Sequence, residues 1–176
     1  FDVISRLKPS WRNELEITDA LQMLLEEKNK INYYKITNYW KDTGTPEDII
    51  HANKVILENM ESYTKGIIEK NVEIIGTVML GKNSIIKSGT KIIGPIIIGE
   101  NSIIESNTIV GPNTSIGNNV TLQDCQINNS IIMDNCIING KINIKNSIIS
   151  FNSNISKQNE NNENVFLLGE GTRIIL

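Results

Sequence analysis

The chain has 176 residues, which is enough for one well-formed core and a second structural element. Its 17 basic and 20 acidic residues give a net charge of -3, and neither sign forms a long block, so no nucleic acid is expected as a partner. No apolar run approaches the roughly 18 residues of a membrane span, and no signal peptide opens the chain. We therefore expect a soluble cytoplasmic protein that does not contact membranes.

Upstream of residue 63 the apolar pattern is mixed. Leucines at helical spacing follow Thr18 and Asp19, either of which can cap a helix, and they predict a helix over about residues 19–28. Residues 31–40 alternate roughly between apolar and polar types, which predicts a strand. The first part of the chain is therefore expected to hold one helix followed by one strand.

A strong helix start follows at Thr45-Pro46-Glu47-Asp48. Threonine stands at the N-cap, proline at the first helical position and an acid at the third, so we predict a helix over about residues 46–60. Five aromatic side chains lie near these elements, and we expect them in the core and not in a platform that stacks nucleotide bases. They are Trp11, Tyr33, Tyr34, Tyr39 and Trp40.

Downstream of residue 63 an aliphatic residue recurs at every sixth position. The ladder consists of Ile68, Ile74, Leu80, Ile86, Ile92, Ile98, Ile104, Val110, Ile116 and Leu122. Four places after each member, from Val72 to Val120, the residue is small or β-branched, and only Gln126 departs from this. Three places after most members comes Asn or Gly, the residue types that tolerate the positive φ of a tight corner.

These three sets of positions all recur every six residues. Together they predict a flat-sided coil with three short parallel strands and three corners per turn. An α-helix has a period near 3.6 and cannot keep an aliphatic residue on one face at every sixth position. At roughly 18 residues per turn, the repeat region predicts a parallel β-helix of about five coils.

Beyond Leu122 the ladder slips to a spacing of five. Its predicted members are Ile127, Ile132, Ile137 and Ile142, with Ile148 six places further on. Cys125 and Cys136 lie among these positions, and we expect them to be small buried thiols and not a disulfide. After a polar loop over residues 156–164, two apolar runs at 165–168 and 172–176 predict a pair of terminal strands.

Three motifs resemble sugar-1-phosphate nucleotidyltransferases. Upstream they are KPSWRNELEITD at residues 8–19 and YWKDTGTPED at residues 39–48. Downstream, IVGPNTSIG at residues 109–117 is similar to the hexapeptide-repeat tail of the long-form glucose-1-phosphate thymidylyltransferases, which are the nearest match in the family.

The resemblance implies a mixed fold. Residues 1–62 would be the C-terminal part of a Rossmann-like α/β nucleotidyltransferase domain, residues 63–155 a left-handed parallel β-helix of hexapeptide repeats, and residues 156–176 a polar loop with terminal strands. The left hand follows from the family alone, because parallel crossovers usually take the other hand. Family members carry a Gly-rich nucleotide loop, a lysine and a first metal-binding aspartate upstream. Since this chain begins at Phe1 without them, we expect it to be the C-terminal half of a larger enzyme whose N-terminal half is missing.

The resemblance also implies a reaction, in which dTTP and glucose-1-phosphate give dTDP-glucose and pyrophosphate with Mg²⁺ as cofactor. Asp42 matches the aspartate of the family's Trp-x-Asp-Thr-Gly motif and is expected to be the second metal ligand. Arg12 is expected to bind the sugar phosphate, since a guanidinium fork suits two phosphate oxygens. Asn13 stands where the family commonly has Gly. Glu14 would either support the sugar pocket or brace Arg12.

Two other interpretations compete with this one. Many β-helices of this type are acyltransferases that use a histidine base, but residues 52–176 contain no histidine. Alternatively, the β-helix acts only as an assembly and regulatory module, which is compatible with the nucleotidyltransferase hypothesis. The stack leaves exposed isoleucine-rich edges, so we expect a homo-oligomer that covers them. The resemblance implies a closed homotrimer, because β-helices of this family commonly pack three chains side by side.

Overall fold

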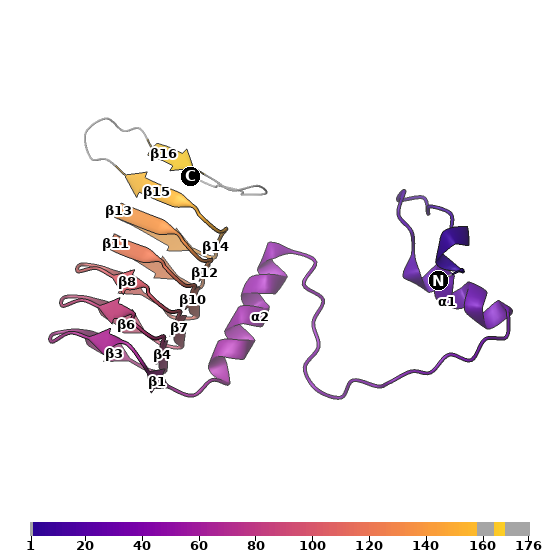
Figure 1. Ribbon diagram of the computed structural model, residues 1–176, viewed down its shortest axis with the longest axis horizontal. Coiled ribbons are helices and arrows are strands. Elements are labelled where there is room, and N and C mark those ends of the chain that lie inside the picture. The colour runs from indigo at the N-terminus through magenta and orange to yellow at the C-terminus, as the bar shows by residue number, and fades with distance from the viewer. Residues whose placement is uncertain (1, 158–163, 168–176) are drawn as a thin grey trace. The chain divides into compact units, whose positions relative to one another are not determined.

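The computed structural model of the protein describes residues 2–157 and 164–167, and the chain divides between Trp40 and Lys41 into two compact units. Figure 1 shows the elements of each unit. The first unit contains a short 3-10 turn, η1 (Ile4–Arg6), and one α-helix, α1 (Ile17–Glu26). None of the described helices is long and apolar enough to cross a bilayer.

Helix α1 begins two residues earlier than predicted. Its N-cap residue is Glu16, whose side chain makes no capping bond to the helix, so the predicted cap at Thr18 or Asp19 is wrong. Both of those residues lie inside the first turn of the helix. The negative charge of Asp19 stabilises the helix there, because it lies near the positive end of the helix dipole. The carboxylate of Glu16 instead accepts hydrogen bonds from Arg12 and Ser10.

The predicted strand over residues 31–40 is also wrong. A strand needs a partner that pairs its backbone groups, and within the described residues no strand pairs with this segment. The five aromatic side chains expected in the core are exposed. Their exposed fractions are 94% for Trp11, 92% for Tyr33, 92% for Tyr34, 55% for Tyr39 and 68% for Trp40.

The second unit opens with α2 (Pro46–Glu58), which starts where the sequence predicts. The hydroxyl of Thr45, at the N-cap, accepts a hydrogen bond from the backbone N–H of Asp48 (3.2 Å). Ile50 and Leu57 are the buried residues of this helix. Although it precedes the boundary expected at residue 62, α2 lies in the same compact unit as the coil.

The coil has three sides, each made of parallel strands. Figure 1 shows these strands stacked from β1 at one end to β15 at the other. The first side contains β1 (Tyr63–Thr64), β4 (Val78–Leu80), β7 (Ile96–Ile98), β10 (Thr114–Ile116), β12 (Ile131–Ile132) and β14 (Ile148–Ile149). The second contains β2 (Ile67–Ile68), β5 (Ile85–Ile86), β8 (Ile103–Ile104), β11 (Thr121–Asn128), β13 (Ile137–Lys145) and β15 (Asn154–Lys157). The third contains β3 (Glu73–Ile75), β6 (Lys91–Ile93) and β9 (Ile109–Val110), and continues into β11. The first side has six strands, so the stack is taller than the five coils estimated from the sequence.

The predicted six-residue ladder forms the core of this coil. From Leu80 to Leu122, every ladder member has an exposed fraction of at most 2%. Ile68 and Ile74, in the first coil, are 36% and 39% exposed because no coil stacks below them among the described residues. The second register is also buried, with Ser84, Ser102 and other small residues at or near zero exposure. The predicted parallel β-helix is therefore confirmed, and it is consistent with the left-handed form that the resemblance implies.

The corners confirm the third register. All seven residues predicted to turn the chain have a positive φ, from 55° to 80°. They are Asn71, Asn83, Gly89, Asn101, Asn107, Asn113 and Asn119. Equivalent asparagines also bond to one another between coils, as Asn83 Nδ2 donates to Asn101 Oδ1 at 3.1 Å. Side-chain amides therefore continue the ladder along this edge.

The predicted five-residue slip is correct for Ile127, Ile132 and Ile142 and wrong for Ile137 and Ile148. Ile127 and Ile132 are buried at 1% exposure, and Ile142 is half-buried against the core. Ile137 is 47% exposed, and Ile148 is only half-buried. The buried positions of the last coils are instead Ile138, Ile144, Ile149 and Ile155.

Shorter coils with a bulge explain this error. Equivalent asparagines lie 18 residues apart in the early coils and 16 or 17 apart in the late ones. The register between β11 and β13 shifts between Gln123 and Cys125, and Asp124 has a φ of 51°. Ile138 is in register with the buried Leu122, and Ile144 is in register with the buried Ile127. Because side chains alternate between the two faces of a strand, this pairing between coils decides which isoleucine of an adjacent pair points inward.

The cysteine prediction is confirmed, since Cys125 and Cys136 are free and buried. Burial raises the pKa of the Cys125 thiol to about 12, so this side chain does not supply a thiolate. The first predicted terminal strand is present as β16 (Asn164–Leu167), which pairs antiparallel with β15. The second, over residues 172–176, lies outside the described residues.

Candidate functional site

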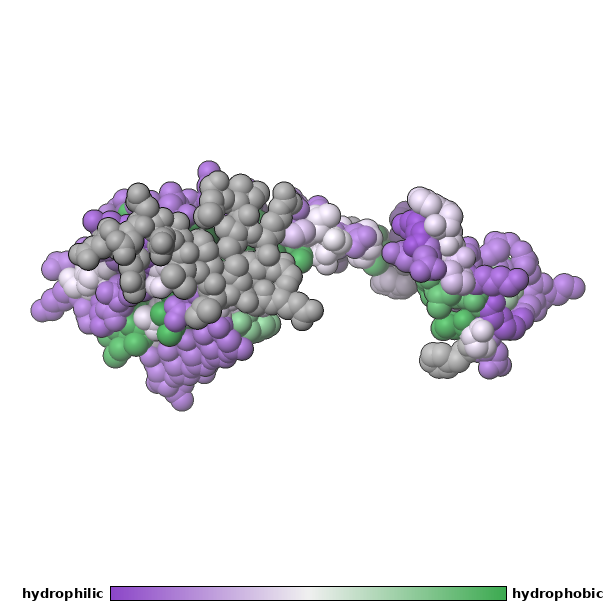
Figure 2. Space-filling view, turned by 90° about the horizontal axis from the view of Figure 1, so that it is seen from above, coloured by the Kyte–Doolittle hydropathy of each residue, from purple (hydrophilic) through white to green (hydrophobic). Residues whose placement is uncertain are grey.

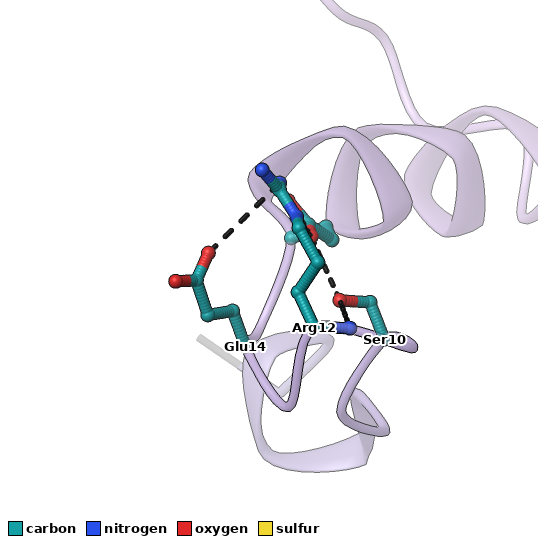
Figure 3. A network of polar contacts seen from close by, with 4 residues as sticks. Ser10, Arg12 and Glu14 are labelled. Carbon is teal, nitrogen blue, oxygen red and sulfur yellow. Dashed lines mark hydrogen bonds and ion pairs between the residues drawn. The ribbon is translucent and has the colours of Figure 1, made fainter.

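Arg12 lies in a tight loop before α1 and is held by the carboxylate of Glu16. Its Nη2 donates to Glu16 Oε1 (2.8 Å) and Oε2 (3.0 Å), and its Nε donates to Oε1 at 3.3 Å. The hydroxyl of Ser10 donates to the same Oε1 at 2.8 Å and accepts from the backbone N–H of Arg12 at 3.2 Å. Figure 3 shows the resulting network. The guanidinium is therefore oriented before any ligand arrives.

Glu16 is the residue that the sequence analysis missed. The missed signal was the spacing, because Arg12 and Glu16 are an i, i+4 pair at the start of a helix. Hydrogen bonds from Arg12 and then from Ser10 hold the pKa of the Glu16 carboxyl below its usual 4.5. Half of the Arg12 side chain stays exposed, at 51%, so part of the guanidinium remains accessible to an anion.

Glu14 points toward Arg12 from the same loop (Figure 3), with its Oε2 at 3.9 Å from Arg12 Nη2. This separation is an ion pair but too long for a hydrogen bond. Asn13, between them, has a φ of 60°, and its N–H donates to the carbonyl of Ser10 at 2.8 Å. Asparagine tolerates this left-handed conformation, so the replacement of the family's glycine leaves the tight turn intact.

Asp42 is exposed in the segment that leads into α2. Its neighbours are tied to the first turn of that helix: Lys41 Nζ lies 2.7 Å from Asp48 Oδ1, and the Thr45 hydroxyl donates to Asp48 Oδ2 at 2.7 Å. Lys41 and then Thr45 hold the pKa of the Asp48 carboxyl below its usual 3.8. The segment that carries Asp42 is thus fixed on both sides by Asp48.

The structure brings Arg12 and Glu14 together in the first unit and places Asp42 in the second. Within the described ranges, no three His, Cys, Asp or Glu side chains converge as a metal site. Mg²⁺ is commonly held by one or two carboxylates together with substrate phosphates, so a single exposed carboxylate such as Asp42 has donor chemistry that fits this ion.

Comparison with known sequences matches both parts of the chain. Residues 1–59 match the family described as Nucleotidyl transferase, and residues 92–175 match the family described as GMPPB C-terminal domain. The segment with Arg12, Glu14, Glu16 and Asp42 thus lies entirely within the Nucleotidyl transferase match.

Named relatives agree with these families. The chain is 54% identical over 127 residues to the low-salt glycan biosynthesis nucleotidyltransferase Agl11 of Haloferax volcanii, a match that covers 72% of this chain and 36% of the relative. It is 32% identical over 118 residues to the glucose-1-phosphate thymidylyltransferase of Streptomyces antibioticus, covering 67% of this chain and 33% of the relative.

The bifunctional protein GlmU of Methanococcus aeolicus is 45% identical over 80 residues, covering 46% of this chain and 19% of the relative. The matched region thus spans about a third or less of the length of these relatives. The resemblance predicted from the sequence is therefore confirmed: the chain carries nucleotidyltransferase sequence followed by a β-helix, as in sugar-1-phosphate nucleotidyltransferases.

Proposed function

We propose that the full-length protein is a sugar-1-phosphate nucleotidyltransferase that makes dTDP-glucose and pyrophosphate from dTTP and glucose-1-phosphate. The observation that carries this proposal is the ordered Arg12 guanidinium within a Nucleotidyl transferase match that also contains Asp42. The name of the Streptomyces antibioticus relative supports the choice of substrates. Nucleoside triphosphates are cytoplasmic metabolites, so we place the reaction in the cytoplasm.

In this reaction a phosphate oxygen of the sugar phosphate attacks the α-phosphorus of the nucleotide. A new P–O bond forms as the bond to the β-phosphate oxygen breaks, and pyrophosphate leaves. Such transfer depends on positioning and charge neutralisation more than on covalent catalysis. Bound Mg²⁺ would supply part of that neutralisation, and Asp42 would be one of its ligands.

Arg12 would bind the sugar phosphate through the part of its guanidinium that stays exposed beside Glu16. Glu16 would orient Arg12, and the 3.9 Å pair between Glu14 and Arg12 favours bracing as the role of Glu14. In the full-length enzyme, Arg12→Ala should raise KM for glucose-1-phosphate more than KM for dTTP. Glu16→Gln should do the same more weakly, because it loosens the guanidinium without removing it. Equal changes in both KM values would contradict the assignment of Arg12 to the sugar phosphate.

The nucleotide loop, the lysine and the first metal-binding aspartate are expected upstream of this chain. The 176-residue chain alone should therefore not release pyrophosphate from dTTP with glucose-1-phosphate and Mg²⁺, whereas the full-length protein should. Turnover by the isolated chain at the full-length rate would overturn the division of the active site between two halves. Absence of turnover in the full-length protein with all common nucleoside triphosphates and sugar phosphates would overturn the proposed function.

We also propose that the β-helix assembles into a homotrimer. Aliphatic side chains point outward from the coil, with exposed fractions of 60% for Ile67, 49% for Ile75 and 47% for Ile137. A closed threefold ring would cover such residues without leaving a propagating interface. Light scattering on this chain at micromolar concentration should give three times the monomer mass, and a monomer would contradict the trimer.

A further inference from the structure

Asn53 of helix α2 forms two hydrogen bonds to the coil. Its Nδ2 donates to the backbone carbonyl of Asn113 at 3.3 Å, and its Oδ1 accepts a hydrogen bond of 2.5 Å from the hydroxyl of Ser115. The partners lie 60 and 62 residues further along the chain, at the corner before β10 and within β10 itself. Both ends of the amide are therefore used, and all three residues are half-buried.

These partners require an amide. A backbone carbonyl can only accept, so it must face the NH₂ group of Asn53, and the Ser115 hydroxyl then donates to the remaining oxygen. An aspartate would direct an oxygen at the Asn113 carbonyl, and an aliphatic residue would leave both partners without this bond. Position 53 therefore requires a side chain with one hydrogen-bond donor and one acceptor, and a side chain of similar size is not enough.

Asn53 also lies in the middle of the buried face of α2. The two buried residues of the helix, Ile50 and Leu57, stand three places before it and four places after it, which is the spacing of one helix face. Apolar contacts tolerate sliding, whereas a slip of one residue would move the amide by about 1.5 Å along the helix and rotate it off this face. A single polar residue in an apolar stripe therefore selects one register of α2 on the coil.

The fixed helix carries the segment that contains Asp42. Asp48, in the first turn of α2, bonds to Lys41 on one side of Asp42 and to Thr45 on the other, each at 2.7 Å. A shift of the helix would therefore move Lys41 and Thr45 with it. The chain of contacts runs from the corner of the coil through Asn53 and Asp48 to the segment of Asp42.

We propose that Asn53 is a positioning residue, through which the corner at Asn113 and Ser115 sets the place of Asp42. The fastening of α2 rests on geometry alone, and the consequence for the metal ligand rests on the proposed function. The coil is then more than an assembly module, because it holds one edge of the site.

The first test is hydrogen exchange on the 176-residue chain. Asn53→Leu keeps an apolar residue on the buried face and removes both bonds, so amides of residues 41–58 should exchange about tenfold faster, as expected for two lost hydrogen bonds. Amides of the coil core should not change. Lys54→Ala, on the exposed neighbouring position, is the matched control and should leave the exchange of α2 unchanged. Unchanged exchange in Asn53→Leu would overturn the fastening.

A second variant separates lost bonds from misfolding. Ser115→Ala removes one partner and keeps the strand, so it should speed the exchange of α2 by a smaller factor. The double variant should exchange no faster than Asn53→Leu alone, because both changes remove the same contact. Additive effects would overturn the assignment of Ser115 as the partner of Asn53.

The last test measures the Mg²⁺ dependence of pyrophosphate release in the full-length enzyme. Asn53→Leu should raise the Mg²⁺ concentration for half-maximal rate by about tenfold, since a small misplacement of a ligand is costly, while Lys54→Ala should not. A purely structural role would lower the amount of folded enzyme without moving this midpoint, and that result would overturn the link to Asp42. If the wild-type enzyme shows no nucleotidyl transfer at all, the proposed function fails and the link with it, while the exchange experiment still decides whether Asn53 fastens α2.

Discussion

The coil and the segment before residue 41 use apolar residues in opposite ways. In the coil, Leu80 and Ile98 are fully buried because each coil supplies the partner strand and the neighbouring side chain of the next. In the first unit, Leu15, Ile17 and Leu25 are 56%, 67% and 56% exposed, and Figure 2 shows green apolar surface on that unit. Each repeat of the coil packs against the next repeat, whereas among the described residues up to Trp40 only Val3 and Ala20 are buried apolar residues.

The largest expected effect is a difference in the free energy of unfolding between variants of the coil and variants of the first unit. Ile98→Ala removes a fully buried ladder residue and should lower the free energy of unfolding of the coil by about 2–5 kcal/mol. Tyr34→Ala, at a side chain that is 92% exposed, should change it by less than about 0.5 kcal/mol. Urea unfolding followed by the circular dichroism of the β-sheet measures both values. Equal losses would contradict the claim that the coil alone supplies the packed core.

A smaller effect concerns the corners. Asn101 has a φ of 55° and accepts a hydrogen bond from Asn83, so Asn101→Ala should cost about 1–2 kcal/mol from backbone strain, together with the lost bond. Asn101→Gly keeps the turn and loses only the bond, for about 0.5–1.5 kcal/mol. Asn13→Gly in the first unit should be close to neutral, because Asn13 turns the chain at a φ of 60° outside any amide ladder. A glycine at position 101 that is as costly as alanine would show that φ is not what the corner requires.

The smallest effect is a local response to acid. Because the pKa of the Asp48 carboxyl is held below its usual 3.8, its bonds to Lys41 and Thr45 stabilise the start of α2 fully above about that pH. The stabilisation is lost as the pH falls through the lowered pKa. NMR titration of the Thr45 and Asp48 amides should show this change, and Asp48→Asn should abolish it. A transition centred above pH 3.8 would contradict the lowered pKa.

The coil could be predicted well from the sequence because the same requirements recur at every turn. An aliphatic residue and a small or β-branched residue must be buried, and Asn or Gly must form the corner. The prediction failed where these requirements are ambiguous: Ile137 and Ile138 are adjacent, and only the pairing between coils, which places Ile138 in register with the buried Leu122, decides that Ile138 points inward. In the site, the motifs identify Arg12, Glu14 and Asp42 as functional residues, whereas they assign no role to Glu16, which stands in the same motif as Arg12. Asn53 could not be found, since its partners lie 60 and 62 residues away and no local pattern marks such a contact.

The most direct test of the proposed nucleotidyltransferase is the loss of one carboxylate in the full-length enzyme. Asp42→Asn should lower kcat for pyrophosphate release by at least about a hundredfold, as expected when a metal carboxylate is removed from a site that neutralises charge. Glu47→Gln, which removes the same charge from an exposed neighbour at the start of α2, should keep a near-normal rate. An Asp42→Asn enzyme with the wild-type kcat and Mg²⁺ dependence would remove Asp42 from the metal site and contradict the account.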